Sequence, residues 1–452
     1  MLEFWDSYSI GTNSKPKTQA LVSKPHNTLT LKHQSTTTVK YLLSLLIVIN
    51  CSLAYAQNYD ILLNDGHVID PKNGIDGKMD VAIKDGKIAR VAEEISASEA
   101  EQVIEVAEYY VTPGLIDIHS HNFHGTEPNA YLSNSFTALP PDGFSIRAGV
   151  TTLVDVGGAG WKNFELFKEQ TIDRSKTRVL SFLNIVGGGM KGGEREQDLS
   201  DMDAEMTGMV AKRHPEVVGV KVAHYAGRNW NPVDWAVEAG EIADIPVMVD
   251  FGGTIPPLPL DSLLLHHLRP GDIFTHAFGH VPGRIPIVNE RGKVRDYVWE
   301  AQERGVIFDV GHGGGSFLFR QAIPAMKEGF RPNTISTDLH TGSMNAGMKN
   351  QINVMSKFLN MDMKLKDVIA ASTWNSAQAI KQDSLGHLSE GAVADVAVIN
   401  VREGDFGFVD SRGFRMDGNQ KLECELTIRE GKVVWDLNGI SRPYWIKEEM
   451  GK

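Results

Sequence analysis

The chain has 452 residues, which is long enough for one large domain and a smaller one. Apolar residues make up 42% of it and charged residues 23%, as in an ordinary globular protein, and the formal net charge is -12. This charge argues against a nucleic-acid or anionic membrane surface, because both require a basic patch, so we expect a small-molecule substrate as the partner.

The N-terminal segment differs in composition from the rest of the chain. Polar residues dominate up to Lys40, and the uncharged run YLLSLLIVINCSLAYA follows. This run is too short for a comfortable membrane span, and its end fits the small-x-small cleavage pattern. We therefore expect a signal peptide and leader over residues 1–56, cleavage near Ala56-Gln57, and an exported, periplasmic mature chain with no stable membrane anchor.

The chain contains two cysteines, one of which lies in the leader. Cys51 offers an alternative lipoprotein anchor, but Asn50 before it is a poor fit to the small residue that such signals need. Only Cys424 would remain after cleavage, and one cysteine cannot form an internal disulfide. Export here does not predict a disulfide-bonded scaffold.

Both ends of the mature chain have a β-rich pattern. From Asp60, the segment DILLNDGHVIDPKNGIDGKMDVAIKDGKIARVAEEI alternates apolar and polar residues and is interrupted by Asp-Gly and Asn-Gly pairs. This pattern predicts short β-hairpins. The segments GAVADVAVINV and LTIREGKVVWDL near the C-terminus have the same character. We predict one small composite β-sandwich domain, built from residues 57–111 and 383–452.

The middle of the chain, residues 112–382, has a different sequence pattern. Short β-branched or apolar runs recur in it: YVTPGLIDIHS, GVTTLVDVGG, RVLSFLNIVGG, VVGVKVAHY, IPVMVDFGG, GDIFTHAFGH, GVIFDVGHGGG and TISTDLHTG. Helix-like stretches such as NPVDWAVEAGEIAD and VRDYVWEAQERG lie between them. This alternation predicts an α/β fold of the (β/α)8 TIM-barrel class, with a doubly wound open sheet as the alternative. The active site of such a barrel lies at the C-terminal ends of its strands, where polar residues cluster here.

The first of these runs ends in two histidines separated by one residue. In a strand, residues i and i+2 point the same way, so the imidazoles of His119 and His121 emerge on one face while Ser120 points elsewhere. Two such imidazoles can bind one cation. The His-x-His pattern alone is a weak signal, but its position at the end of the first barrel strand favours a metal site.

Three further runs end in groups that can bind a metal or carry charge. Lys221 ends VVGVK, where a buried ammonium is costly, so we expect it to be paired with a carboxylate or carboxylated by carbon dioxide. His276 ends the sixth run and Asp338 the eighth. Nitrogen and oxygen ligands without thiolate suit zinc, manganese, iron or cobalt rather than a structural zinc site.

With these motifs in this order, the chain resembles the amidohydrolase superfamily, and within it the deacetylase-type, dihydroorotase-like metallohydrolases. The resemblance rests on PGLIDIHSH, GVKV, THAF, DVGHGGGSF, STDLH and GHLSEGAVADVAVI. It implies two divalent metals, expected to be zinc: one held by His119, His121 and Asp338, and a second by His276. Carboxylated Lys221 would bridge them.

One position departs from the family pattern. Where the family has a histidine at the end of the fifth strand, this chain has Asp250 in IPVMVDFGG. Three arrangements stay open: Asp250 is itself a ligand, His224 or His280 supplies the missing imidazole, or the site holds a single metal.

The resemblance implies hydrolysis of an amide or ester, with Asp338 as general base and then general acid. We predict deacylation of small N-acyl or O-acyl acids. The alternatives are hydrolysis of a cyclic amide, deamination with one metal and an unmodified Lys221, or an inactive binding protein. The predicted substrate-binding residues are His224, Tyr225, Arg228 and His312. The glycine-rich loop over residues 186–194 is interpreted either as a cover of the site or as a surface loop without function. Relatives of this type form dimers or larger assemblies, so a homo-oligomer is also expected.

Overall fold

The computed structural model describes residues 58–124, 137–250 and 253–445. The predicted signal peptide, leader and cleavage site lie outside these residues, so export and periplasmic location stay predictions. Among the residues that the structure describes, none of the helices combines the length and apolar character that a membrane span requires.

The N-terminal part forms the predicted hairpins. Strands β1 (Tyr59–Asp70), β2 (Ile75–Lys84) and β3 (Lys87–Ala92) pair antiparallel in chain order. Asp85 and Gly86 in the second turn both have positive φ, 49° and 74°, as a two-residue type I′ turn requires. The Asp-Gly signal in the sequence therefore specifies this hairpin.

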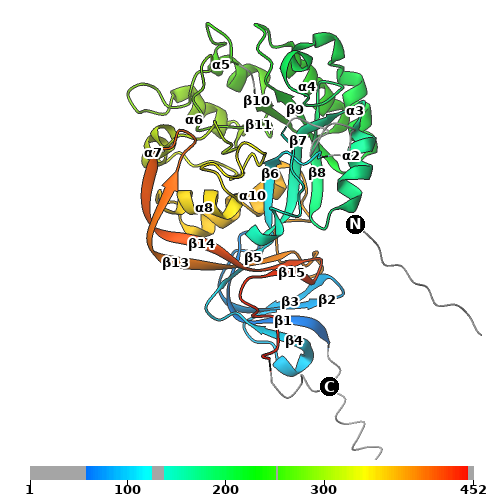
Figure 1. Ribbon diagram of the computed structural model, residues 1–452, viewed down its shortest axis with the longest axis vertical. Coiled ribbons are helices and arrows are strands. Elements are labelled where there is room, and N and C mark those ends of the chain that lie inside the picture. The colour runs from blue at the N-terminus through cyan, green and yellow to red at the C-terminus, as the bar shows by residue number, and fades with distance from the viewer. Residues whose placement is uncertain (1–57, 125–136, 251–252, 446–452) are drawn as a thin grey trace, which may run out of the picture. The chain divides into compact units, whose positions relative to one another are not determined.

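The C-terminal strands join the same sheet. Strands β4 (Ala100–Glu105), β5 (Tyr110–Pro113), β13 (Val396–Val409), β14 (Arg415–Arg429) and β15 (Lys432–Asp436) complete it. The order is β15-β14-β13-β5-β1-β2-β3, with β4 paired to β1 (Figure 1). Strands from residues 59–113 and from residues 396–436 thus share one sheet, and β5 extends two residues beyond the predicted limit at residue 111. The sandwich arrangement and the domain limits stay predictions.

The middle of the chain forms a second, parallel sheet. Its strands are β6 (Leu115–Ser120), β7 (Val150–Gly160), β8 (Arg178–Asn184), β9 (Val217–Ala223), β10 (Val247–Asp250), β11 (Ile273–Phe274) and β12 (Ile307–Phe308). They lie side by side in chain order, and each falls within a predicted run except β7, which extends two residues beyond its run. A doubly wound sheet reverses its strand order at a switch point, so the open-sheet alternative was wrong. Isolated parallel bridges join Asp309 to Thr334 and Ser120 to Leu339, so the eighth run contacts both edges of the sheet.

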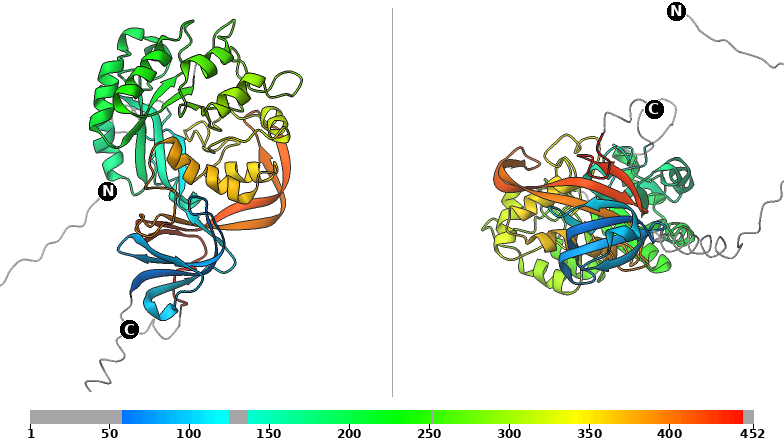
Figure 2. Two further views of the ribbon diagram at one scale, coloured as in Figure 1. Left: turned by 180° about the vertical axis from the view of Figure 1, so that it is seen from behind. Right: turned by 90° about the horizontal axis from the view of Figure 1, so that it is seen from below.

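Helices follow the parallel strands and pack around them (Figure 2). They are α2 (Phe164–Gln170), α3 (Ala204–Arg213), α4 (Asn231–Ala243), α5 (Leu260–Ser262), α6 (Asp296–Glu303), α7 (Phe319–Lys327), α8 (Gln351–Leu359), α9 (Leu365–Ala371) and α10 (Trp374–Ala379). The two helix-like stretches of the sequence correspond to α4 and α6.

The packing of α4 explains where Lys221 points. Val233 and Ala236 of α4 share an apolar cluster with Val220 and Val222 of β9. Because side chains alternate along a strand, Lys221 between these two valines points to the opposite face. It is fully buried there.

Candidate metal centre

His119 is held by a chain of hydrogen bonds beneath the site. Its Nδ1 lies 2.8 Å from Thr275 Oγ1, and the Thr275 hydroxyl donates to Asp309 Oδ2 at 2.7 Å. Because the hydroxyl proton goes to the carboxylate, the oxygen accepts from the protonated Nδ1 of His119. This fixes the tautomer and leaves a lone pair on Nε2. Burial and the nearby charge of Lys221 lower the pKa of His119 to about 3, so the imidazole is neutral.

Asp338 meets both histidines of the His-x-His motif. Its Oδ1 lies 2.9 Å from His121 Nε2 and 3.6 Å from His119 Nε2. One ligand atom from each of the three buried residues lies within 4.8 Å of the others. Although burial alone would raise the pKa of Asp338, His119 and His121 lower it below its ordinary value, so the carboxylate is ionised. Two imidazoles and a carboxylate in this arrangement fit a divalent metal ion.

Lys221 faces the same cavity as these ligands. The cavity has a volume of about 300 Å³ and is lined by His119, His121, Lys221, Asp338 and further polar residues. Lys221 Nζ is buried without a hydrogen-bond partner among the described residues, and burial lowers its pKa. Burying a charged amine without a partner costs free energy. We therefore expect Lys221 Nζ to bind an anion or to carry a carboxyl group.

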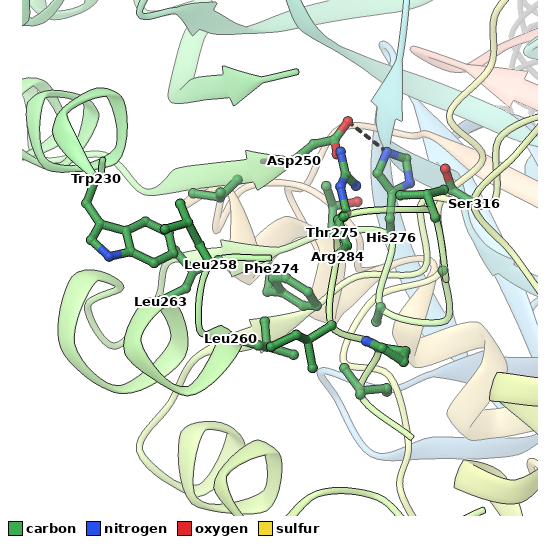
Figure 3. A pocket seen from close by; sticks show the side chains of 18 residues that line it. Trp230, Asp250, Leu258, Leu260, Leu263, Phe274, Thr275, His276, Arg284 and Ser316 are labelled. Carbon is green, nitrogen blue, oxygen red and sulfur yellow. Dashed lines mark hydrogen bonds and ion pairs between the residues drawn. The ribbon is translucent and has the colours of Figure 1, made fainter. Parts of the chain in front are cut away.

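Asp250 lies at the centre of a second cluster. Its Oδ2 is 3.2 Å from His276 Nε2 and 3.4 Å from His224 Nε2, and its Oδ1 is 2.5 Å from Arg284 Nη2. Figure 3 shows the carboxylate, the His276 ring and the guanidinium facing one another. Burial raises the pKa of Asp250, but Arg284 and His276 outweigh it and hold the pKa well below its ordinary value.

Comparison with known proteins places this site in a family. A deacetylase of Agrobacterium fabrum is 34% identical over 337 residues, which cover 73% of this chain and 80% of the relative. A family model described as the amidohydrolase family matches residues 319–434. This chain belongs to the amidohydrolase family. It is therefore a hydrolase that acts on carbon–nitrogen bonds, and the family resemblance seen in the sequence is confirmed.

Other relatives of this amidohydrolase differ in their named activities. A deacetylase of Enterococcus faecalis is 29% identical over 384 residues, covering 83% of this chain and 99% of the relative. The solved structure of an adenine deaminase has a TM-score of 0.74 at 28% identity and covers 84% of this chain and 100% of its own. That of a dihydroorotase has a TM-score of 0.73 at 31% identity, with 83% and 99% covered.

The structure does not bring His312 into the cavity of the amidohydrolase. The His312 ring is fully buried and stacks on Phe317, with ring centroids 4.4 Å apart. Its Nδ1 donates to the Gly313 carbonyl at 2.9 Å, and its Nε2 accepts from Lys357 Nζ at 2.6 Å. Both ring nitrogens are used within the protein, so the geometry does not support a substrate contact.

Lys357 links three separate segments around His312. Besides the imidazole, its Nζ donates to the carbonyl oxygens of Gly347 at 2.7 Å and Val409 at 2.9 Å. Val409 belongs to β13, so this buried ammonium ties the composite sheet to the loop after β12. Burial lowers the pKa of Lys357 to about 7, and the three acceptors match the three N–H donors of its protonated form.

Replacing Lys357 by Met should destabilise the fold, because it leaves three buried acceptors without a donor. We expect the free energy of unfolding to fall by about 3 kcal/mol. Urea denaturation followed by circular dichroism measures it, with the exposed Lys366→Met on α9 as the matched control. Equal stability of the two variants would contradict this role of Lys357.

Of the remaining predicted substrate-binding residues, one lines the cavity and two do not. His224 lines the cavity. Tyr225 is buried and its hydroxyl accepts from Asn229 Nδ2 at 2.9 Å, while the exposed Arg228 donates to the Pro256 carbonyl at 2.8 Å. Neither is among the cavity-lining residues. His280, one candidate for the missing imidazole, lies 3.1 Å from Arg320 and does not line the cavity either.

Sequence reasoning missed several residues that do line the cavity. They are Thr137, Met190, Val281, Arg284, Gly314, Gly315, Ser316 and His340. His340 was within reach, because it lies two positions after Asp338 in STDLH, and its Nε2 is 3.8 Å from Asp338 Oδ2. Met190 lies in the glycine-rich loop over residues 186–194, so the sequence predicts this segment near the site but does not single out the residue. Nothing in the sequence singles out Arg284.

Proposed function

We propose that this amidohydrolase removes acyl groups from small N-acyl or O-acyl acids by metal-dependent hydrolysis. The observation that carries the proposal is the buried cluster of His119, His121 and Asp338, which shares one cavity with the unpartnered Nζ of Lys221. The deacetylases of Agrobacterium fabrum and Enterococcus faecalis, which match most of the chain, support the choice of reaction over cyclic-amide hydrolysis.

The donor set fits divalent metal ions. His119, His121 and Asp338 would hold one ion, His276 and Asp250 would contribute to a second, and carboxylated Lys221 would bridge them. Zinc is the preferred choice, with manganese, iron or cobalt as alternatives for the same ligands. When bound, the metals supply Lewis-acid activation of water and of the scissile carbonyl.

The protein's own groups position the reaction and move its protons. The hydrogen bonds from His119 through Thr275 to Asp309 hold the imidazole in one tautomer and orientation. The ionised Asp338 would accept a proton from the attacking water on a carboxylate oxygen. It would then donate that proton to the leaving nitrogen or oxygen as the tetrahedral intermediate breaks down.

An apolar pocket beside the cavity supports a substrate with an apolar group. The pocket and the cavity share Asp250, His276 and Arg284, and the pocket extends away from them to Trp230 (Figure 3). Its apolar walls include Trp230, Leu258, Leu260, Leu263, Phe274 and Ile285. We propose that the side chain or acyl chain of the substrate lies in this pocket.

The finer features of the fold and the setting of the enzyme belong to the same proposal. We propose that the run TISTDLHTG completes the (β/α)8 barrel as its eighth strand, which the two bridges to neighbouring strands support. The composition of residues 1–56 supports export to the periplasm. A homo-oligomer is proposed by resemblance alone.

Purified mature protein should hydrolyse N-acyl amino acids, with a preference for apolar side chains. We expect kcat/KM to be at least about tenfold higher for N-acetyl leucine than for N-acetyl glycine, since burial of an apolar group is worth this much. The panel should also contain acyl esters of hydroxy acids and cyclic ureides. Activity should disappear on chelation and return with zinc.

The control for this panel is His119→Ala, prepared in the same way, which should show no turnover. Hydrolysis restricted to cyclic ureides would contradict the deacylase proposal in favour of a dihydroorotase-like reaction. Equal kcat/KM for the glycine and leucine substrates would contradict the role of the apolar pocket.

A further inference from the structure

Two imidazole nitrogens and a carboxylate oxygen lie close together at Asp250. His276 Nδ1 donates to the Gly311 carbonyl at 2.5 Å, and His224 Nδ1 donates to Glu196 Oε2 at 2.8 Å. In a neutral imidazole the other nitrogen then carries a lone pair. Both Nε2 atoms face Asp250 Oδ2, at 3.2 and 3.4 Å. These nitrogen and oxygen atoms are ligands of the kind that a divalent metal ion binds.

Asp250 already forms an ion pair with Arg284 through Oδ1. A metal ion bound by the two imidazole nitrogens and by Oδ2 would leave this ion pair in place, and it would share the anionic charge of a carboxylated Lys221.

Glu196 holds His224 in the way that metal-binding histidines are usually held. The Glu196 residue is only 1% exposed, and its Oε1 accepts from the Gly192 amide at 2.8 Å. The neighbouring Gln197 donates to the His224 carbonyl at 2.9 Å. A carboxylate that accepts the second N–H of an imidazole fixes its tautomer and makes its free nitrogen a better ligand. The segment after the glycine-rich loop therefore supports His224.

His224 has the same unusual backbone conformation as two residues of the proposed metal centre. His224, His276 and Asp338 have φ angles of 57°, 58° and 51°, in the left-handed region that residues other than glycine seldom adopt. All three follow the end of a parallel-sheet run. Strained backbone of this kind persists where the surrounding structure fixes a side chain for function.

We infer that His224 is a ligand of the second metal, together with His276 and Asp250. The inference rests on the proposed metal-dependent function and goes beyond it. In the family this imidazole comes from the end of the fifth strand, and here we place it at the end of the fourth. The two strands make this exchange possible: the His224 amide donates to the Asp250 carbonyl at 2.9 Å, so the residues are neighbours across the sheet. Glu196 and Arg284 are positioning residues that orient His224 and Asp250.

Metal content tests this inference without relying on turnover. Wild-type protein saturated with zinc and freed of excess metal should contain two ions per chain, by elemental analysis. His224→Ala should contain one. Glu196→Gln keeps the imidazole but loses its carboxylate partner, so it should bind the second ion about ten- to a hundredfold more weakly while the first is unchanged. Loading with manganese adds a spectroscopic readout, since electron paramagnetic resonance distinguishes a coupled pair from an isolated ion.

The matched control is His266→Ala, an exposed histidine away from the cavity, which should keep both ions. Circular dichroism shows whether each variant is folded. One ion in the wild type, or two ions bound with unchanged affinity in His224→Ala, would overturn the inference. Failure of the acylated substrates to react would contradict the proposed function alone, because the metal count does not depend on the substrate.

Discussion

Replacing Asp338 by Asn should lower kcat by about a thousandfold for the best acylated substrate, the loss expected when a general acid–base group is removed. Asparagine keeps the size of the side chain and an oxygen that can face His121, but it cannot accept or return a proton at neutral pH. The carboxylate of Asp338 is ionised because His119 and His121 lower its pKa. Steady-state kinetics measure the loss, and elemental analysis measures the metals in the same preparation.

The interpretation of this variant depends on the metal count. If metals are retained while kcat falls, the lost function is proton transfer. If the metals are lost as well, the effect belongs to ligation by Asp338 and not to acid–base catalysis. The exposed Asp405→Asn on β13 is the matched control and should behave as wild type. A kcat within a few-fold of wild type in Asp338→Asn would remove Asp338 from the mechanism.

Much of the parallel sheet was predictable because strands and turns leave local signals. Each of the first seven predicted runs coincides with a strand, and these seven strands lie in chain order in the sheet. Residues at the ends of neighbouring parallel strands must lie close together, so the sequence order alone indicates that His119, Lys221, His276 and Asp338 share a cavity. The eighth run has the right residues but forms only isolated bridges among the described residues.

The parts that were missed depend on contacts between segments far apart in the sequence. Arg284 reaches Asp250 from a loop 34 residues later, and no periodicity marks a loop arginine as a partner. His312 has the position of a substrate-binding residue, but Lys357 lies 45 residues away and binds its free nitrogen. A position at the end of a strand therefore predicts that a residue lies near the site. Whether its side chain faces the cavity depends on the hydrogen-bond partners that other segments supply.

Replacing Lys221 should also have a large effect on activity. The carboxyl group proposed on this lysine can be substituted by a carboxylate added to the buffer. Carbon dioxide would form a bond with the Nζ nitrogen, which releases a proton and becomes an anionic carbamate. Lys221→Ala removes both the amine and this group. We expect kcat to fall by about a thousandfold, since a charged group aimed at the reacting atoms is lost. The bound metal should fall in the same variant.

Short-chain carboxylates should partly restore the activity of Lys221→Ala. The alanine leaves the space of the lysine side chain empty beside the cavity, and the oxygens of propionate or butyrate can occupy the place of the carbamate oxygens. If Lys221 instead acts as an ammonium paired with Asp250 or Asp338, an added anion would supply the wrong charge and would not restore kcat. Asp338→Asn in the same buffer is the control that should show no rescue. Native mass spectrometry of the wild type should also show the added carbon dioxide, and its absence together with failed rescue would rule out the carboxylated lysine.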